Sequence, residues 1–127
     1  DARRVQAGIQ AIRAGLPRKG LPVMVVHGTD DGLIPPAFSS APYVAAAKAA
    51  GREVNYWQVR HVQHFDGFLG LPDYGARYLP LLPYVYAALA RVQERLDKGT
   101  PLPVDAMIET TPRAGRPLTA ENLAMPK

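Results

Sequence analysis

Apolar positions along the first hundred residues predict alternating helices and strands. An amphipathic helix is predicted over residues 3–16, because apolar side chains recur there every three or four positions. These side chains are Val5, Ile9, Ile12 and Leu16. The continuous apolar run over residues 23–26 is typical of a strand buried on both faces of a parallel sheet. The same criteria predict a helix over residues 42–50, a strand over residues 53–59 and an amphipathic helix over residues 80–98.

The segments between and after these elements are less regular. Ser39 and Ser40 stand just before the predicted helix over residues 42–50 and are expected to cap it. Residues 60–79 hold three glycines and a proline, which predicts a long irregular loop of the kind that often carries function. Residues 100–127 hold five prolines and little periodicity, so we expect an extended tail on the surface of a domain formed by residues 1–99. Within that tail, Thr119 and Asn122 suggest a short turn.

Each predicted strand runs into a polar loop with residues suited to catalysis. Asp30 and Asp31 follow the first strand, and His61 and His64 follow the second. In an open parallel sheet, ligands bind beyond the carboxyl ends of the strands, so both loops are expected at one site. A histidine general base needs a carboxylate that fixes its tautomer and stabilises the imidazolium, and this pattern predicts such a pair. His27, at the end of the first strand, is interpreted as packing or bonding to nearby backbone.

Bulk composition narrows the classes of function. The chain has 127 residues, 47% of them hydrophobic, which is typical of a globular domain, and no apolar run is long enough for a transmembrane helix. The formal charge of +4 comes from scattered basic residues, which argues against a nucleic-acid binder. The absence of cysteine excludes disulfides, thiolate metal sites and cysteine nucleophiles. Because the chain begins at Asp1 and not at Met, we expect a fragment, a processed product or a cleaved chain.

A metal site is an alternative interpretation of the second loop. His61, His64 and Asp66 carry the nitrogen and oxygen ligands that zinc or iron accept. Their spacing does not place three ligands on one helical face, so no metal and no cofactor are expected. The apolar side chains of the same loop either line a substrate pocket or anchor the loop. They are Phe65, Phe68, Leu69, Leu71 and Tyr74.

The first loop resembles a known motif. H-G-x-x-D-x-x-(I/V)-P after a buried strand matches residues 27–35, and it is similar to the acid-bearing loop of α/β-hydrolases, in which acid precedes histidine along the chain. This resemblance implies that Asp31 is the acid of a Ser-His-Asp triad and that His64 is its histidine. If the register slips by one residue, Asp30 takes the place of Asp31.

A narrower resemblance covers nearly all of the chain after Leu21. The first loop, SSAPY (39–43), QHFD (63–66), LPDYGARYLPL (71–81) and ETTPR (109–113) together resemble the D-(−)-3-hydroxybutyrate oligomer hydrolase family. The resemblance implies a serine esterase that cleaves short 3-hydroxybutyrate oligomers to monomers. It also implies a secreted or periplasmic location, although cytoplasmic relatives are known.

One feature of that family is missing from this sequence. No G-x-S-x-G occurs, and Ser39 and Ser40, the only serines, do not lie on a strand-to-helix turn with flanking glycines. We therefore expect the C-terminal part of an α/β-hydrolase fold, with the nucleophile and the oxyanion hole on an upstream polypeptide. Two alternatives remain: another esterase or peptidase of the same fold, and a non-catalytic α/β binding module.

Overall fold

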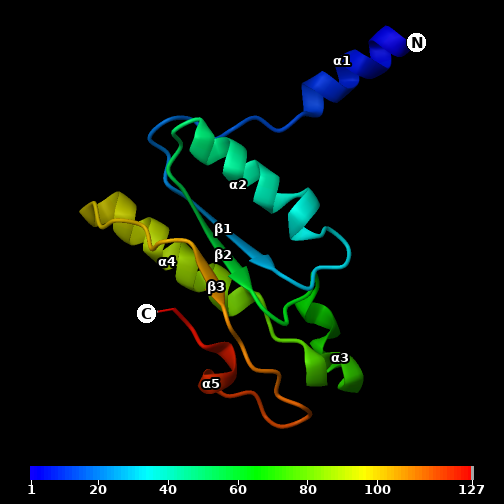
Figure 1. Cartoon of the computed structure of the whole chain (residues 1–127), viewed down its shortest axis with the longest axis vertical. Helices are drawn as coiled ribbons and strands as arrows, with labels where there is room; N and C mark the ends of the chain where they lie inside the picture. Colours follow the sequence, from blue (N-terminus) through cyan, green and yellow to red (C-terminus); the bar gives the residue numbers. More distant parts are fainter. Residues whose placement is uncertain (127) are drawn as a thin grey trace.

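The computed structural model describes residues 1–126 and contains a small parallel sheet with helices on both faces (Figure 1). The elements are α1 (Ala2–Ile12), β1 (Val23–Gly28), η1 (Pro36–Phe38), α2 (Ser40–Ala49), β2 (Val54–Val59), η2 (Asp66–Gly70), α3 (Pro72–Arg77), α4 (Leu82–Lys98), β3 (Ala106–Ile108) and α5 (Ala120–Leu123). Their strands pair in the order β1-β2-β3, and both pairs are parallel. The predicted α/β class and the parallel pairing of the first two strands are confirmed.

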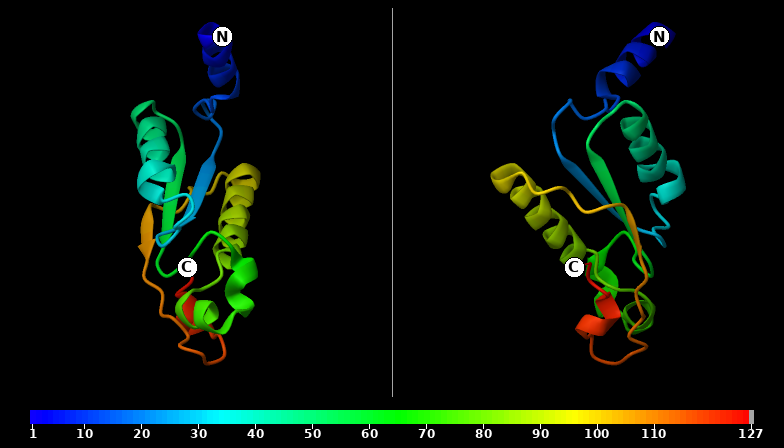
Figure 2. Two further views of the ribbon diagram at one scale, coloured as in Figure 1. Left: turned by 90° about the vertical axis from the view of Figure 1, so that its right-hand side faces the viewer. Right: turned by 60° about the vertical axis from the view of Figure 1, so that its left-hand side comes forward.

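Register and packing bring the ends of β1 and β2 to one place. The two strands pair over their full length, from Val23 opposite Val54 to Gly28 opposite Val59. Helix α2 covers one face of the sheet and α4 the other, as two rotated views show (Figure 2). The two cores are therefore separate. The core on the α2 side comprises Val44, Ala47, Val54 and Tyr56, and the core on the α4 side comprises Trp57, Val59, Val62, Leu79, Tyr84, Ala88 and Ile108.

The first helix is present, but it covers nothing in the described part of the chain. Helix α1 ends at Ile12, four residues before the predicted end, and none of its residues is buried. Its apolar stripe is open to solvent, with Val5, Ile9 and Ile12 at least half exposed. The helix projects away from the sheet (Figure 1). Sequence periodicity therefore predicted the helix correctly, and its apolar side chains contact no core within residues 1–126.

The predicted role of the two serines as helix caps is wrong. Ser39 occupies the N-cap position of α2, but its side chain donates to the carbonyl of Pro35 at 2.9 Å and makes no capping bond. Ser40 is already inside the helix, and its hydroxyl bonds to side chains 13 and 16 residues away. These partners come together only in the folded chain, so local sequence could not reveal them.

The remaining long helix ends where its sequence predicts and begins at Leu82, two residues after the predicted start. Helix α4 has Pro83 in its first turn and ends at Lys98, followed by Gly99 in the left-handed conformation (φ 72°) that a glycine adopts easily. Its amino end is capped from a distance, because the Asp66 carboxylate accepts hydrogen bonds from the backbone N–H groups of Leu81 and Leu82. Inside the predicted loop over residues 60–79, η2 and α3 form short helical turns.

The tail contributes to the sheet. Strand β3 pairs with β2, and the buried side chains of Leu102, Ile108 and Thr110 fix the segment against the domain. This strand was not predicted, because three residues are too few for a periodicity. The expected turn at Thr119 and Asn122 is confirmed as the capping box of α5. Residue 127, the last of the predicted tail, lies outside the described residues.

Gly28 allows the loop after β1 to approach the loop after β2. A Cβ atom built on Gly28 would lie 2.3 Å from the carbonyl oxygen of Val62, which is backbone and cannot rotate away. That same carbonyl accepts a hydrogen bond from the N–H of Asp30 at 3.1 Å. The loop after β1 therefore lies directly against the loop after β2 because residue 28 has no side chain.

Gly28→Ala should destabilise the protein, whereas Gly32→Ala in the same loop should not. The first change forces the two loops apart at a cost of about 1–3 kcal/mol, as overpacking usually does. The second places a methyl group with no contact closer than 3.8 Å, so its effect should stay within about 0.5 kcal/mol. Urea unfolding of both variants measures the difference. Equal stability of the two would contradict the close approach at Gly28.

Candidate active site

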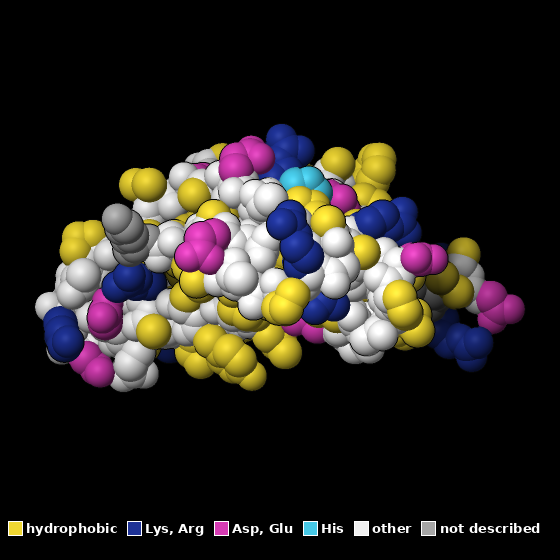
Figure 3. Space-filling model, turned by 90° about the horizontal axis from the view of Figure 1, so that it is seen from below, with side chains coloured by type: hydrophobic (Ala, Val, Ile, Leu, Met, Phe, Trp, Pro, Cys, Tyr) yellow, Lys and Arg dark blue, Asp and Glu magenta, His cyan; other side chains and the backbone are white. Residues whose placement is uncertain are grey.

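The Asp31 carboxylate and the His64 imidazole are in contact at the carboxyl ends of β1 and β2. Asp31 Oδ2 lies 2.9 Å from His64 Nδ1. Asp31 is buried, with 6% of its surface exposed, whereas the His64 side chain is 31% exposed. Seen from this end, histidine atoms reach the surface beside acidic and hydrophobic side chains (Figure 3). The structure thus brings together the two residues that the sequence singled out.

Four donors surround the Asp31 carboxylate. Its Oδ1 accepts the backbone N–H groups of Leu33 at 3.0 Å and Ile34 at 2.8 Å. Its Oδ2 accepts His64 and also His27, whose Nε2 lies 3.2 Å away. Burial disfavours the charged form of Asp31, but the hydrogen bonds from these four groups outweigh it and lower the pKa of the carboxyl below its ordinary value. Asp31 is therefore a carboxylate at neutral pH.

The charge on Asp31 fixes the tautomer of His64. A carboxylate only accepts hydrogen bonds, so His64 Nδ1 carries the proton that points at Asp31. In the neutral ring the lone pair is then on Nε2, which makes no hydrogen bond within residues 1–126. A hollow of about 210 Å³ borders His64, and its lining residues are Val26, His27, Asp31, Ile34, His64 and Leu81. This arrangement suits a general base, because Nε2 is able to accept a proton from a donor outside the described residues.

Further hydrogen bonds join the two loops. Gln63, next to His64, accepts the N–H of Gly32 through its side-chain oxygen at 3.1 Å. The N–H of Thr29 donates to the carbonyl of Val59 at 2.8 Å. These contacts hold the histidine loop and the aspartate loop as one unit. This role of Gln63 was not predicted from the sequence, although its place beside His64 in the QHFD segment was a signal.

The other candidate residues lie elsewhere. Within the described residues the Asp30 side chain bonds only to the hydroxyl of its neighbour Thr29, and this contact is exposed. His61 has a positive φ of 53°, and its Nδ1 lies 3.1 Å from the Thr110 hydroxyl, on the side of the tail. The Asp66 carboxylate caps α4. Within residues 1–126 no group of three possible ligands is arranged to hold a metal ion.

His27 is the residue that sequence analysis placed wrongly. It was expected to pack or to bond to backbone, but both of its ring nitrogens bond to side chains. Nε2 faces Asp31 Oδ2, and Nδ1 lies 2.6 Å from the hydroxyl of Ser40. The spacing H-G-x-x-D was a signal, because it places His27 at the end of β1 and Asp31 four residues later, at the start of the loop.

The aromatic side chains after His64 form a series of edge contacts. Phe65 packs edge-on against the His64 ring at 4.5 Å, and Phe68, Tyr74 and Tyr78 continue the series. Phe65 and Phe68 are about half exposed, at 49% and 50%. Phe65 therefore contacts the ring of His64 from one side, and the exposed parts of both phenylalanines leave apolar surface near it.

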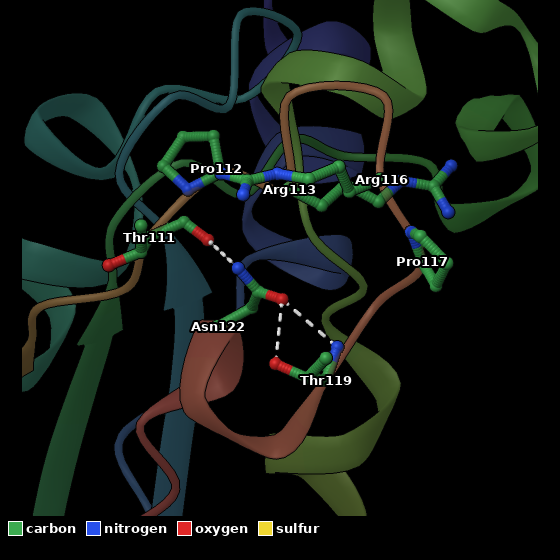
Figure 4. Close-up of a pocket in the computed structure, with 7 residues that line it drawn as sticks. All are labelled: Thr111, Pro112, Arg113, Arg116, Pro117, Thr119 and Asn122. Carbon is green, nitrogen blue, oxygen red and sulfur yellow. Dashed lines mark hydrogen bonds between the residues drawn. The ribbon is translucent and has the colours of Figure 1, made fainter.

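A second hollow, of about 390 Å³, lies in the tail (Figure 4). Its lining residues are Thr111, Pro112, Arg113, Arg116, Pro117, Thr119 and Asn122. The Asn122 side chain bonds to the Thr111 carbonyl and to Thr119, as the close-up shows. No histidine or carboxylate lines it, so it has no general base. The smaller hollow at Asp31 and His64 is the better candidate.

Comparisons with known proteins point to one family. The profile of the family described as 3HB-oligomer hydrolase (3HBOH) matches residues 1–127. A protein of Paracidovorax citrulli named D-(−)-3-hydroxybutyrate oligomer hydrolase is 40% identical to this chain over 94% of the chain's length. A protein of the same name from an Azoarcus species is 38% identical over 97% of this chain's length. The chain spans 18% and 19% of the length of these two relatives. No solved structure matches the chain, and none of its described helices is long and apolar enough to cross a membrane.

The hydrogen bonds to Asp31 predict a pH-dependent contribution to stability. Because its pKa is lower in the folded protein than in the unfolded chain, this contribution is complete above the unfolded value of about 3.9 and is lost as pH falls through the folded value. Asp31→Asn should therefore be clearly less stable than the wild type at pH 6, and the difference should shrink as pH falls below about 4. Denaturant unfolding of both proteins across this range measures it.

Asp30→Asn is the matched control for this measurement. It removes one exposed hydrogen bond, so it should change stability by at most about 0.5 kcal/mol at pH 6. A stability difference between wild type and Asp31→Asn that is the same at every pH would contradict the hydrogen-bonded carboxylate.

Proposed function

Because the chain belongs to the 3HB-oligomer hydrolase family, we propose that it is the part of a serine esterase that supplies the acid and the histidine of a Ser-His-Asp triad. The proposed substrate is an oligomer of 3-hydroxybutyrate, and the products are monomers. The fold would then be the C-terminal part of an α/β-hydrolase. The contact between Asp31 Oδ2 and His64 Nδ1, at 2.9 Å, is the observation that carries this proposal.

In the proposed mechanism His64 transfers protons and Asp31 stabilises the charge that forms on His64. A serine oxygen attacks the ester carbonyl while His64 Nε2 takes its proton. The imidazolium that forms is stabilised by the Asp31 carboxylate, which stays ionised throughout. His64 then gives the proton to the oxygen of the departing hydroxyacid as the acyl–oxygen bond breaks. Water, activated by the same histidine, hydrolyses the acyl-enzyme and regenerates the serine. No cofactor takes part.

The proposed nucleophile lies on the upstream polypeptide, since neither serine of this chain is suited to the task. Ser39 is bonded to backbone carbonyls and Ser40 to His27 and Tyr56. Backbone donors for the oxyanion, which carry a large share of the rate in such enzymes, would come from the same upstream part.

Exposed surfaces support an upstream partner. Within the described residues β1 pairs on one edge only, so its other edge is open to a further strand. An apolar groove of about 290 Å³ lies between β1 and α4, lined by Met24, Val26, Val85, Ala88, Leu89 and Val92. A further strand and helix would cover this edge and this groove. The apolar stripe of α1 is also open to solvent, on a helix that projects away from the sheet. A secreted or periplasmic location is also part of the proposal and rests on the resemblance alone.

In the full-length enzyme, His64→Ala should lower kcat for the 3-hydroxybutyrate trimer by about 10⁴-fold or more, because the reaction loses its general base. His61→Ala is the matched control, since it lies three residues away and bonds to Thr110 instead of Asp31. It should keep activity within about threefold, provided that the variant folds. A His64→Ala enzyme with near-normal turnover would refute the triad.

Substrate preference separates this proposal from another esterase or a peptidase of the same fold. The full-length enzyme should hydrolyse the 3-hydroxybutyrate trimer with a kcat/KM at least about tenfold above that for a simple acyl ester of similar size. Release of the 3-hydroxybutyrate monomer, followed by chromatography, measures the reaction. A preference for the simple ester or for a peptide would assign the same two residues to a different hydrolase.

A further inference from the structure

A line of hydrogen bonds runs from the hydroxyl of Tyr56, in the core between α2 and the sheet, to Oδ2 of Asp31. The hydroxyl of Tyr56 lies 2.5 Å from Ser40 Oγ, and Ser40 Oγ lies 2.6 Å from His27 Nδ1. His27 Nε2 then lies 3.2 Å from Asp31 Oδ2. Tyr56 is on β2, His27 on β1 and Ser40 on α2, so three elements meet in this line.

The charge on Asp31 sets the direction of every bond in the line. The carboxylate can only accept, so His27 Nε2 donates to it. In the neutral ring Nδ1 then accepts from the hydroxyl of Ser40, and the oxygen of Ser40 accepts from the hydroxyl of Tyr56. In this direction every hydrogen of the line has an acceptor.

Burial makes the line rigid. Tyr56 is 6% exposed and belongs to the core between α2 and the sheet, and the His27 side chain is 13% exposed. His64 is the more exposed of the two rings that bond to Asp31 Oδ2. The backbone N–H groups of Leu33 and Ile34 hold only Oδ1. The orientation of Oδ2 is therefore set from the buried side by His27.

We propose that His27, Ser40 and Tyr56 form a positioning line that holds Oδ2 of Asp31 in the orientation from which it accepts the Nδ1–H of His64. This inference rests on the proposed function, since it assigns the three residues to the reaction of the same site. His27 does not contact the reacting atoms and acts through Asp31, and Ser40 and Tyr56 act through His27.

Two substitutions of His27 separate positioning from packing. In His27→Gln the side-chain amide can place a donor near the position of Nε2 and keep the bond to Asp31. In His27→Asn the shorter amide reaches only the position of Nδ1, so it can meet Ser40 but not Asp31. In the full-length enzyme, His27→Gln should keep kcat for the 3-hydroxybutyrate trimer within about fivefold of the wild type. His27→Asn should lower kcat by about 10²-fold with little change in KM, since misplacing a catalytic group has that effect.

The same experiment on Ser40 tests the next link. Ser40→Thr keeps the hydroxyl and should retain most of the activity, whereas Ser40→Ala should lower kcat by about tenfold. This pair also covers the case in which a His27 variant fails to fold, which circular dichroism would reveal. Equal kcat in Ser40→Ala and Ser40→Thr, or in His27→Gln and His27→Asn, would overturn the positioning line.

Combining His27→Asn with Asp31→Asn shows whether His27 acts through Asp31. If it does, His27→Asn should cause no further loss of kcat in the Asp31→Asn background, because the carboxylate that it positions is gone. Losses that multiply would overturn the inference while leaving the proposed function intact. Wild-type activity in Asp31→Asn alone would instead overturn the proposed function. The two failures are thus distinguishable.

Discussion

Burial of one carboxylate is the constraint that organises this molecule. A charged group out of water is unfavourable unless donors replace the water it loses, and Asp31 has four such donors. Two come from its own loop and two from histidines on different elements. They reach it because β1 and β2 pair in register to their last residues and because Gly28 lets the two loops touch. Fold and site therefore depend on each other, since losing the register would separate the buried carboxylate from His64.

The same packing leaves apolar surfaces and one edge of the sheet uncovered within residues 1–126. Monomeric proteins rarely expose large contiguous apolar surfaces, yet here the stripe of α1, the groove along α4 and an edge of the sheet are all uncovered within residues 1–126. The chain spans less than a fifth of the relatives to which it is similar. Both observations support the proposal that a further strand and helix cover these faces. His64 Nε2 also has no hydrogen-bond partner within residues 1–126, so it is free to meet the proposed serine.

Sequence alone gave the elements that have a strong local signal. The two strands predicted over residues 23–26 and 53–59 are present at 23–28 and 54–59. The helix that ends before Gly99 and the pairing of Asp31 with His64 likewise follow from periodicity or from a motif. The unpredicted features depend on contacts distant in sequence. Strand β3 is three residues long, Asp66 caps a helix that begins 16 residues later, and Ser40 bonds to residues 13 and 16 positions away. A helix-cap rule describes neighbours along the chain, so it could not assign Ser40 correctly.

His27 shows most clearly how a local interpretation can fail. As the fifth residue of an apolar strand it looked like part of a turn, and an apolar side chain there would also suit a strand. Such a side chain would leave Oδ2 of Asp31 with one donor, the partly exposed ring of His64. A buried polar group that loses a partner costs about 1–3 kcal/mol, and the loss would fall on the atom that has to face the histidine. A histidine at position 27 supplies the second donor, and Ser40 and Tyr56 hold that histidine in place. The polar residue in the strand is therefore better explained by the carboxylate four residues later than by the strand itself.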